Sequence, residues 1–209
     1  MPPTCDVRRP LRNTSTSTVI IDTPPTLGPV EPRLAPLPYE QWDDELRAVF
    51  GADSLNIFGT LAHHPKLLKR WLVFGNHVLA KSTLSARDRE LLILRVGWLC
   101  RAPYEWGQHV VMARQAGLSD AEITRVSVGP EAPEWSPVEV ALLRAADELH
   151  ADQTISDTTY AALNAHYSER ELLDVVFTVG QYHLVSMALN TFRVERDDGV
   201  TDVPIPARE

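Results

Sequence analysis

The chain has 209 residues, of which 44% are hydrophobic and 23% charged, and its formal net charge at pH 7 is −8. This length and composition are typical of a globular protein with a sizeable hydrophobic core. Because no run of Lys and Arg interrupts the acidic balance, we expect neither nucleic acid nor a membrane surface as a partner.

The chain is expected to divide into three parts. Residues 1–38 are rich in Pro and Thr and cannot form a core of their own, which predicts a flexible N-terminal arm. Residues 39–196 are predicted to form one helical domain, and residues 197–209 a C-terminal tail. The arm begins without an apolar signal segment, and apolar runs such as Leu184 to Leu189 are too short to span a bilayer. These features predict a cytoplasmic protein.

Helical signals follow one another along the middle part. Four serines precede an acidic residue by three positions, which is the spacing of a helix-capping box: Ser85–Asp88, Ser119–Glu122, Ser136–Glu139 and Ser168–Glu171. Gly117 has the position of a helix C-cap. The predicted helices cover 40–50, 65–81, 86–100, 103–116, 119–126, 137–151, 157–165 and 169–193. No segment alternates with the period of a strand, so the fold is predicted to be all-α.

Two of these helices are apolar on more than one face. They contain the stretches 91–100 and 172–192, which leave little room for a solvated side. Such helices lie at the centre of a core or in a subunit contact. We therefore expect a homo-oligomer.

The stretch "RAPYEWGQH", residues 101–109, contains the main candidate site. On a regular helix Glu105 and His109 share a stripe that is otherwise apolar, with Ala102, Met112, Ala113 and Ala116. Burial lowers and a carboxylate raises the pKa of an imidazole, which suits general acid/base chemistry near neutral pH. The alternative is an ordinary local pair on a half-buried helix. Glu90, in the first turn of the preceding apolar helix, is a third candidate, or simply an acid that favours the helix dipole.

Other polar residues on apolar helices are weaker candidates. His77 and His183 belong to helices that are mostly apolar, where they line a cavity or serve as satisfied core groups. The histidines and acids form no HxxxH or HExxH motif, so no metal is expected. Neither a glycine-rich phosphate loop nor a GxSxG elbow is present, and no cofactor is expected.

The segments "RELLILR", "YEWGQH" and "AGLSDAEI", in this order, resemble the carboxymuconolactone decarboxylase family of the alkylhydroperoxidase D-like (AhpD-like) superfamily. The resemblance is strongest over residues 55–130. It implies an all-helical fold with a six-helix core, often assembled as a trimer or hexamer; a dimer is also considered.

The peroxidase branch of that superfamily carries a Glu, a CxxC pair and a His in a fixed pattern. On this chain the pattern falls on Glu90, Ala102, Glu105 and His109, so both thiols are missing. The two cysteines of the chain, Cys5 and Cys100, lie outside the pattern. Dithiol chemistry needs a thiolate and a resolving partner, so a thiol peroxidase is not expected.

The resemblance instead implies a thiol-free lyase that moves protons on a small carboxylic acid or lactone, without an organic cofactor. The expected roles are proton donor for His109, orienting group or base for Glu105, and control of the protonation state for Glu90. Arg95 or Arg101 is expected to hold a substrate carboxylate. The remaining substrate-binding candidates are Tyr104, Trp106, His77 and His183.

Two further interpretations stay open. One is a metal-dependent enzyme that uses Glu90, Glu105 and His109 as ligands, with His77 or His183. The other is a binding or scaffold protein that keeps the fold without catalysis. We favour the cofactor-free enzyme over both.

Overall fold

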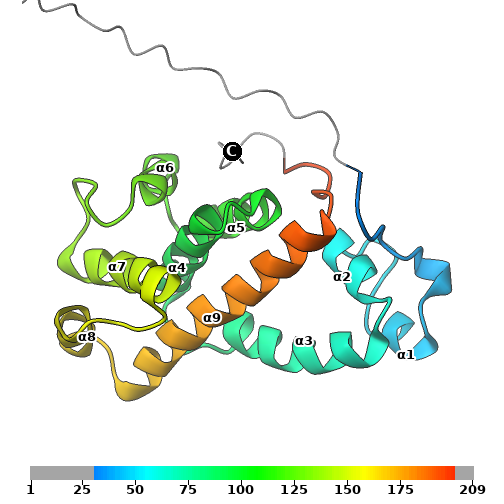
Figure 1. Ribbon diagram of the computed structural model, residues 1–209, viewed down its shortest axis with the longest axis horizontal. Coiled ribbons are helices and arrows are strands. Elements are labelled where there is room, and N and C mark those ends of the chain that lie inside the picture. The colour runs from blue at the N-terminus through cyan, green and yellow to red at the C-terminus, as the bar shows by residue number, and fades with distance from the viewer. Residues whose placement is uncertain (1–30, 201–209) are drawn as a thin grey trace, which may run out of the picture.

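The computed structural model describes residues 31–200, and all regular structure within them is helical, as the sequence predicts. Most of the predicted arm, 1–38, and of the predicted tail, 197–209, lies outside the described residues. The elements are a 3-10 turn (Tyr39–Gln41), α1 (Asp44–Arg47), α2 (Asn56–Leu61), α3 (Pro65–Ala80), α4 (Ala86–Leu99), α5 (Pro103–Gln115), α6 (Asp120–Val128), α7 (Pro137–Asp152), α8 (Asp157–Asn164) and α9 (Glu169–Phe192) (Figure 1).

Helix α4 is the centre of the fold and packs against α5, α7 and α9 (Figure 1). One side of α4, including Leu92 and Val96, joins a core cluster with residues of α7 and α9. Its other side, including Leu91 and Leu94, joins a second cluster with Trp106 on α5. Every residue from 90 to 97 is buried, which explains why α4 is apolar on more than one face.

The capping pattern is confirmed at three helix starts. Ser119, Ser136 and Ser168 each accept a hydrogen bond from the backbone N–H three residues later, and the Glu at that position bonds back to the serine. Ser85 caps α4 through the Asp88 N–H without the reciprocal bond. Gly117 follows α5 with φ of 90°, the left-handed conformation that favours glycine at a helix end.

The predicted helix over 40–50 is wrong in detail. Trp42 has an extended backbone, and the Asp43 carboxylate caps the Leu46 N–H and starts the short α1. Helix α2 is absent from the sequence prediction because Leu55, at its N-cap, offers no capping side chain. Short helices of this kind are held by tertiary packing rather than by local signals.

The folded body reaches beyond 39–196 at both ends. The Arg33 N–H donates to the Phe192 carbonyl at 2.9 Å, which joins the start of the described chain to the end of α9. Asp197 accepts hydrogen bonds from the Asn56 N–H at 2.8 Å, the Tyr104 hydroxyl at 2.5 Å and Gln108 at 2.7 Å. The segment around Asp197 is thereby fixed between α2 and α5.

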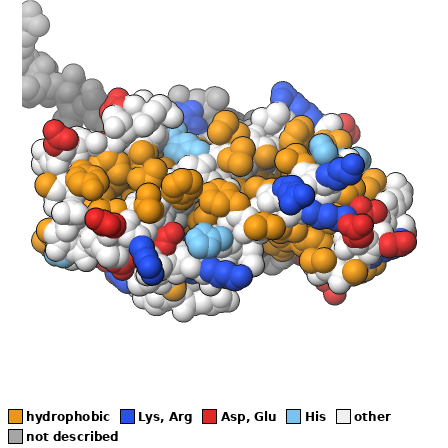
Figure 2. Space-filling view, turned by 90° about the horizontal axis from the view of Figure 1, so that it is seen from below, with side chains coloured by type: hydrophobic (Ala, Val, Ile, Leu, Met, Phe, Trp, Pro, Cys, Tyr) orange, Lys and Arg blue, Asp and Glu red, His pale blue; other side chains and the backbone are white. Residues whose placement is uncertain are grey.

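The expectation that no apolar segment is long enough to cross a membrane does not hold for helix α9. Among the described helices it alone meets that requirement in length and composition. Half of its most apolar window is buried within the protein, as in the core helix of a globular protein. Its outer side contributes to a face on which hydrophobic side chains gather in a band (Figure 2).

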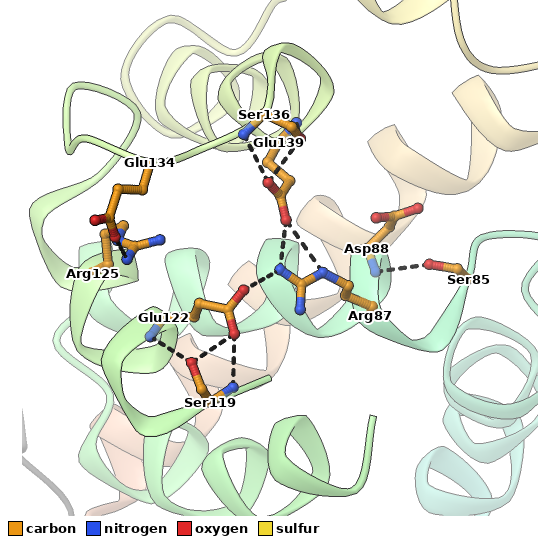
Figure 3. Close-up of polar contacts among 9 residues, drawn as sticks. All are labelled: Ser85, Arg87, Asp88, Ser119, Glu122, Arg125, Glu134, Ser136 and Glu139. Carbon is orange, nitrogen blue, oxygen red and sulfur yellow. Dashed lines mark hydrogen bonds and ion pairs between the residues drawn. The ribbon is translucent and has the colours of Figure 1, made fainter. Parts of the chain in front are cut away.

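Arg87 joins the starts of three helices (Figure 3). Its guanidinium lies between Glu122 and Glu139, the carboxylates of the capping boxes of α6 and α7, and donates to Glu139 at 2.6 Å. Hydrogen bonding by Arg87 and by Ser119 lowers the pKa of Glu122 to about 2. One cation therefore fixes two caps against the first turn of α4.

Replacing Arg87 with Gln is expected to lower the free energy of unfolding by about 1–2 kcal/mol, because two carboxylates lose a charged donor. The contribution of Glu122 is present above its unfolded pKa, about 4.5, and is lost as the pH falls through about 2. Urea unfolding at pH 7 and pH 3 measures both effects. Arg114→Gln removes an exposed pair with Asp120 and is the control, with a change below about 0.5 kcal/mol. Equal losses in the two variants would contradict the role of Arg87.

Candidate functional site

Three polar side chains from α4 and α5 meet in the core. Glu90, Glu105 and His109 are exposed by only 1%, 3% and 6%. His109 Nδ1 lies 2.7 Å from Glu90 Oε2, and His109 Nε2 lies 2.9 Å from Glu105 Oε1. The structure thus places the imidazole between two buried carboxylates, and we call these three residues the Glu–His–Glu cluster.

The two contacts of the imidazole are unequal. The contact with Glu90 has hydrogen-bond geometry, whereas Glu105 Oε1 is close to His109 but lacks it. Glu90 therefore fixes the orientation of the ring, and Nε2 faces Glu105. Burial lowers the pKa of His109, but the two carboxylates outweigh burial and raise it to about 9. The imidazolium form is consequently the form present at neutral pH.

An arginine that the sequence analysis overlooked completes the charge balance. Arg89 Nε lies 3.5 Å from Glu90 Oε1, and both atoms are buried without a hydrogen-bond partner. The positive charges of the His109 imidazolium and Arg89 thereby balance the negative charges of Glu90 and Glu105. The sequence contained a signal for this position, because Arg89 is three residues before the core residue Leu92 and therefore lies on the same face of the helix.

Helix α9 supplies the remaining side of the site. The edge of the Tyr182 ring meets His109 with 4.9 Å between ring centroids and an interplanar angle of 86°. Burial, followed by the charges of Glu105 and Glu90, raises the pKa of Tyr182 well above its usual value. Tyr182 is therefore a neutral hydroxyl that remains a potential hydrogen-bond donor at neutral pH.

Neither arginine proposed from the sequence reaches the site. Arg101 does not share a helical stripe with Glu105, because Pro103 starts α5 and Arg101 lies before it in a left-handed turn, exposed. Arg95 is buried, but its guanidinium binds Asp147 at 2.5 and 3.0 Å and the carbonyl groups of Val126 and Ser127. Its donors are already used within the fold.

The two aromatic candidates also belong to other clusters. Tyr104 is buried against Ile57 and Leu189, and its hydroxyl is bonded to Asp197. Trp106 is a core residue beside Leu91 and Leu94, and its ring lies 5.2 Å from that of Trp98. The sequence could not separate these positions from the site because all lie within one turn of Glu105 or His109.

The two histidine candidates lie elsewhere. The His77 side chain is 56% exposed and lies 3.9 Å from Asp174 on α9. His183 follows Tyr182 in the chain but points to His150, with 2.8 Å between the ring nitrogens. The Glu–His–Glu cluster therefore forms without either of them.

The fold is that of the AhpD-like helical proteins, and this chain lacks the paired thiols of the peroxidase pattern. The positions of the CxxC pattern hold Ala102 and Glu105. Residues 65–148 match the model of the carboxymuconolactone decarboxylase family. Over this segment, which is less than half of its length, the chain is similar to that family. No curated protein matches the chain in sequence.

Solved structures extend the likeness over more of the chain. A protein of unknown function from Agrobacterium tumefaciens is 25% identical, with 66% of this chain and 94% of that one covered and a TM-score of 0.61. An AhpD-core, peroxidase-related protein from Ralstonia eutropha JMP134 is 18% identical, with coverages of 83% and 98% and a TM-score of 0.69. A variant of the debrominase Bmp8 in complex with 2,3,4-tribromopyrrole is 12% identical, with coverages of 80% and 92% and a TM-score of 0.69.

The raised pKa of His109 gives a test that needs no substrate. Nuclear magnetic resonance titration of the histidine rings is expected to show one imidazole with a pKa near 9. Stabilisation by its protonated form is complete below about pH 6.5 and is lost as the pH rises through about 9. Glu90→Gln removes one carboxylate and lowers this pKa. His77→Gln, at an exposed position, is the control. An unchanged His109 pKa in Glu90→Gln would contradict the assigned contact.

Proposed function

We propose that the protein is a cofactor-free acid/base enzyme of the decarboxylase type, acting on a small carboxylic acid or lactone. The observation that carries the proposal is His109, a buried imidazolium held between Glu90 and Glu105. Burying charged side chains away from water costs free energy unless their charges are fully paired, and such a cost is typical of groups that take part in catalysis. One oxygen of each carboxylate lies in an ion pair without hydrogen-bond geometry, which supports use rather than pairing alone.

The proposed reaction begins with a carboxylic acid whose C–C bond to the carboxylate lies next to an unsaturated or lactone carbonyl system. That bond breaks, carbon dioxide leaves, and the electron pair stays on the organic fragment as a dienolate-like anion. The imidazolium of His109 then donates its proton to a carbon of this anion. Protonation of carbon by a positioned acid is the step that the enzyme must provide.

The contacts of each residue suggest its role in this reaction. Glu90 holds Nδ1 and keeps the imidazole charged, so the proton on Nε2 is the one to be transferred. Glu105 faces Nε2 and passes to it a proton taken up from solvent after turnover, which replaces the proton that the decarboxylation consumes. Arg89 is the cation nearest the cluster and takes the place of Arg101 as the group that attracts the substrate carboxylate. Tyr182, whose ring contacts that of His109, provides a neutral hydroxyl.

The similar structures fit this proposal at the level of fold and ligand size. The debrominase in complex with 2,3,4-tribromopyrrole shows that an AhpD-like protein can bind a small ring compound. The present chain lacks the thiol pair at Ala102 and Glu105, so proton transfer rather than thiol chemistry is proposed. The acidic composition and the lack of a cysteine framework support a cytoplasmic location.

Turnover of a panel of small unsaturated lactone acids tests the proposal, with carbon dioxide release and solvent deuterium incorporation as readouts. For an accepted substrate, His109→Gln is expected to lower kcat at least about 100-fold, because the acid that protonates the substrate carbon is lost. Activity of the parent protein is expected to fall as the pH passes about 9. Glu105→Gln loses the return of the proton, whereas the exposed His77→Gln keeps full activity. Unchanged turnover in His109→Gln would refute the assignment of the donor.

We also propose that the partner on the apolar face is a second copy of the chain. Phe74 on α3 and Phe177 on α9 form an edge-to-face pair at 6.0 Å and are both exposed. The same two helices carry further exposed apolar residues, Val73, Leu173, Val176, Leu184 and Met187. Figure 2 shows a band of hydrophobic side chains across one face of the molecule. Contiguous apolar patches of this kind mark protein contacts, and closed homo-oligomers are their commonest form. A dimer, trimer or hexamer would bury it.

Light scattering coupled to size-exclusion chromatography measures this assembly. Phe177→Glu is expected to shift the protein to a smaller species, because a carboxylate would be buried in the contact. Val49→Glu changes an apolar residue next to α1 that is even more exposed than Phe177, and it is the control. A monomeric parent protein, or an oligomer unchanged by Phe177→Glu, would contradict the proposed contact.

A further inference from the structure

A second group of chemically competent side chains includes His183, the residue that follows Tyr182 in α9. Cys100 follows the last residue of α4, His150 is in the last turn of α7, and His183 is in the middle of α9. One donor atom from each residue, a sulfur and two imidazole nitrogens, lies within 4.8 Å of the other two. All three residues are partly buried. We call them the Cys–His–His cluster.

We propose that the Cys–His–His cluster is a binding site for a transition-metal ion of the zinc class. Thiolate sulfur and imidazole nitrogen are the ligands that such ions prefer, at about 2.3 and 2.0–2.1 Å. Three protein ligands leave a fourth position for water or a small anion, the arrangement of an open rather than a closed site. The site is independent of the proposed proton-transfer reaction.

The imidazole tautomers are arranged for this role. His183 Nδ1 donates to the Val179 carbonyl at 2.8 Å, which leaves the lone pair of its Nε2 facing His150. Metal-ligating histidines typically fix their second nitrogen in this way. The pKa of His150 is lowered, first by burial and then by the charge of His183, which favours the neutral imidazole that a metal ion needs as a ligand.

The distance between the rings needs only a small adjustment. His150 Nδ1 and His183 Nε2 are 2.8 Å apart and share one proton. Two nitrogens bound to one tetrahedral ion are about 3.3 Å apart. The metal would replace the shared proton after His150 takes its other tautomer, with the rings separating by about half an ångström. The backbone of Cys100 is held in place, since Asn190 donates to its carbonyl at 2.9 Å.

The thiol does not fit a nucleophilic role. Burial raises the pKa of Cys100 to about 11, with the Ser186 hydroxyl acting in the opposite direction and the charge of Glu105 acting in the same direction. Reactive cysteines instead have a lowered pKa. A divalent ion would deprotonate this thiol, so binding at neutral pH releases about one proton for each ion.

Titration of Co²⁺ into the full-length protein with Cys5→Ser, which leaves Cys100 as its one thiol, tests the proposal. A near-ultraviolet thiolate-to-cobalt band is expected, with visible bands of a four-coordinate ion, and Zn²⁺ displaces the Co²⁺. Adding Cys100→Ser abolishes the thiolate band, and His183→Gln weakens binding. Calorimetry of Zn²⁺ in two buffers of different ionisation enthalpy detects the released proton.

The controls separate this site from the Glu–His–Glu cluster. Glu90→Gln and Glu105→Gln are expected to leave the thiolate band intact. If a variant fails to fold by circular dichroism, Zn²⁺ protection of the Cys100 thiol from alkylation in the Cys5→Ser protein gives the same information. Absence of Co²⁺ binding would overturn the proposal. So would Co²⁺ binding that gives no thiolate band and disappears in Glu105→Gln.

Discussion

The burial of charge along α4 is the constraint on which the rest of the structure depends. Residues 90 to 97 form an unbroken buried stretch that includes Glu90 and Arg95. A charge in such a place is tolerated only when neighbouring elements supply its partner. Helix α7 supplies Asp147 to Arg95, and α5 supplies His109 to Glu90. The positions of α5 and α7 around α4 are therefore tied to these charged pairs as well as to the hydrophobic clusters.

The charges of α4 separate into structural and functional groups by how completely they are satisfied. The Arg95 guanidinium uses its donors on Asp147 and on two carbonyl groups, and Arg87 lies between two helix-capping carboxylates. Around His109, in contrast, an oxygen of Glu90, an oxygen of Glu105 and the Arg89 Nε are buried without hydrogen-bond partners. Buried polar atoms of this kind are costly and uncommon, which makes the Glu–His–Glu cluster the place to look for chemistry.

Helix α9 connects the proposed activities of the molecule. Tyr182 on its inner side touches the proton-transfer cluster, and the next residue, His183, belongs to the Cys–His–His cluster. The outer side of the same helix carries exposed apolar residues, which the proposed subunit contact would cover. Because both its inner and its outer side make apolar contacts or expose apolar residues, α9 has no continuous polar face. Its length and composition therefore resemble those of a membrane-spanning helix, although half of its most apolar window is buried in the protein.

The sequence by itself determined the all-helical fold, because capping serines and apolar periodicity are local signals that report helix starts and faces directly. It also brought Glu90, Glu105 and His109 together as candidates, through a family pattern and a four-residue spacing. Only the tertiary structure decided that Arg89, and not Arg101, lies beside the cluster, because a left-handed turn before Pro103 removes Arg101 from the helix. The approach of Cys100, His150 and His183 was likewise invisible, since three separate helices must pack before their side chains can meet.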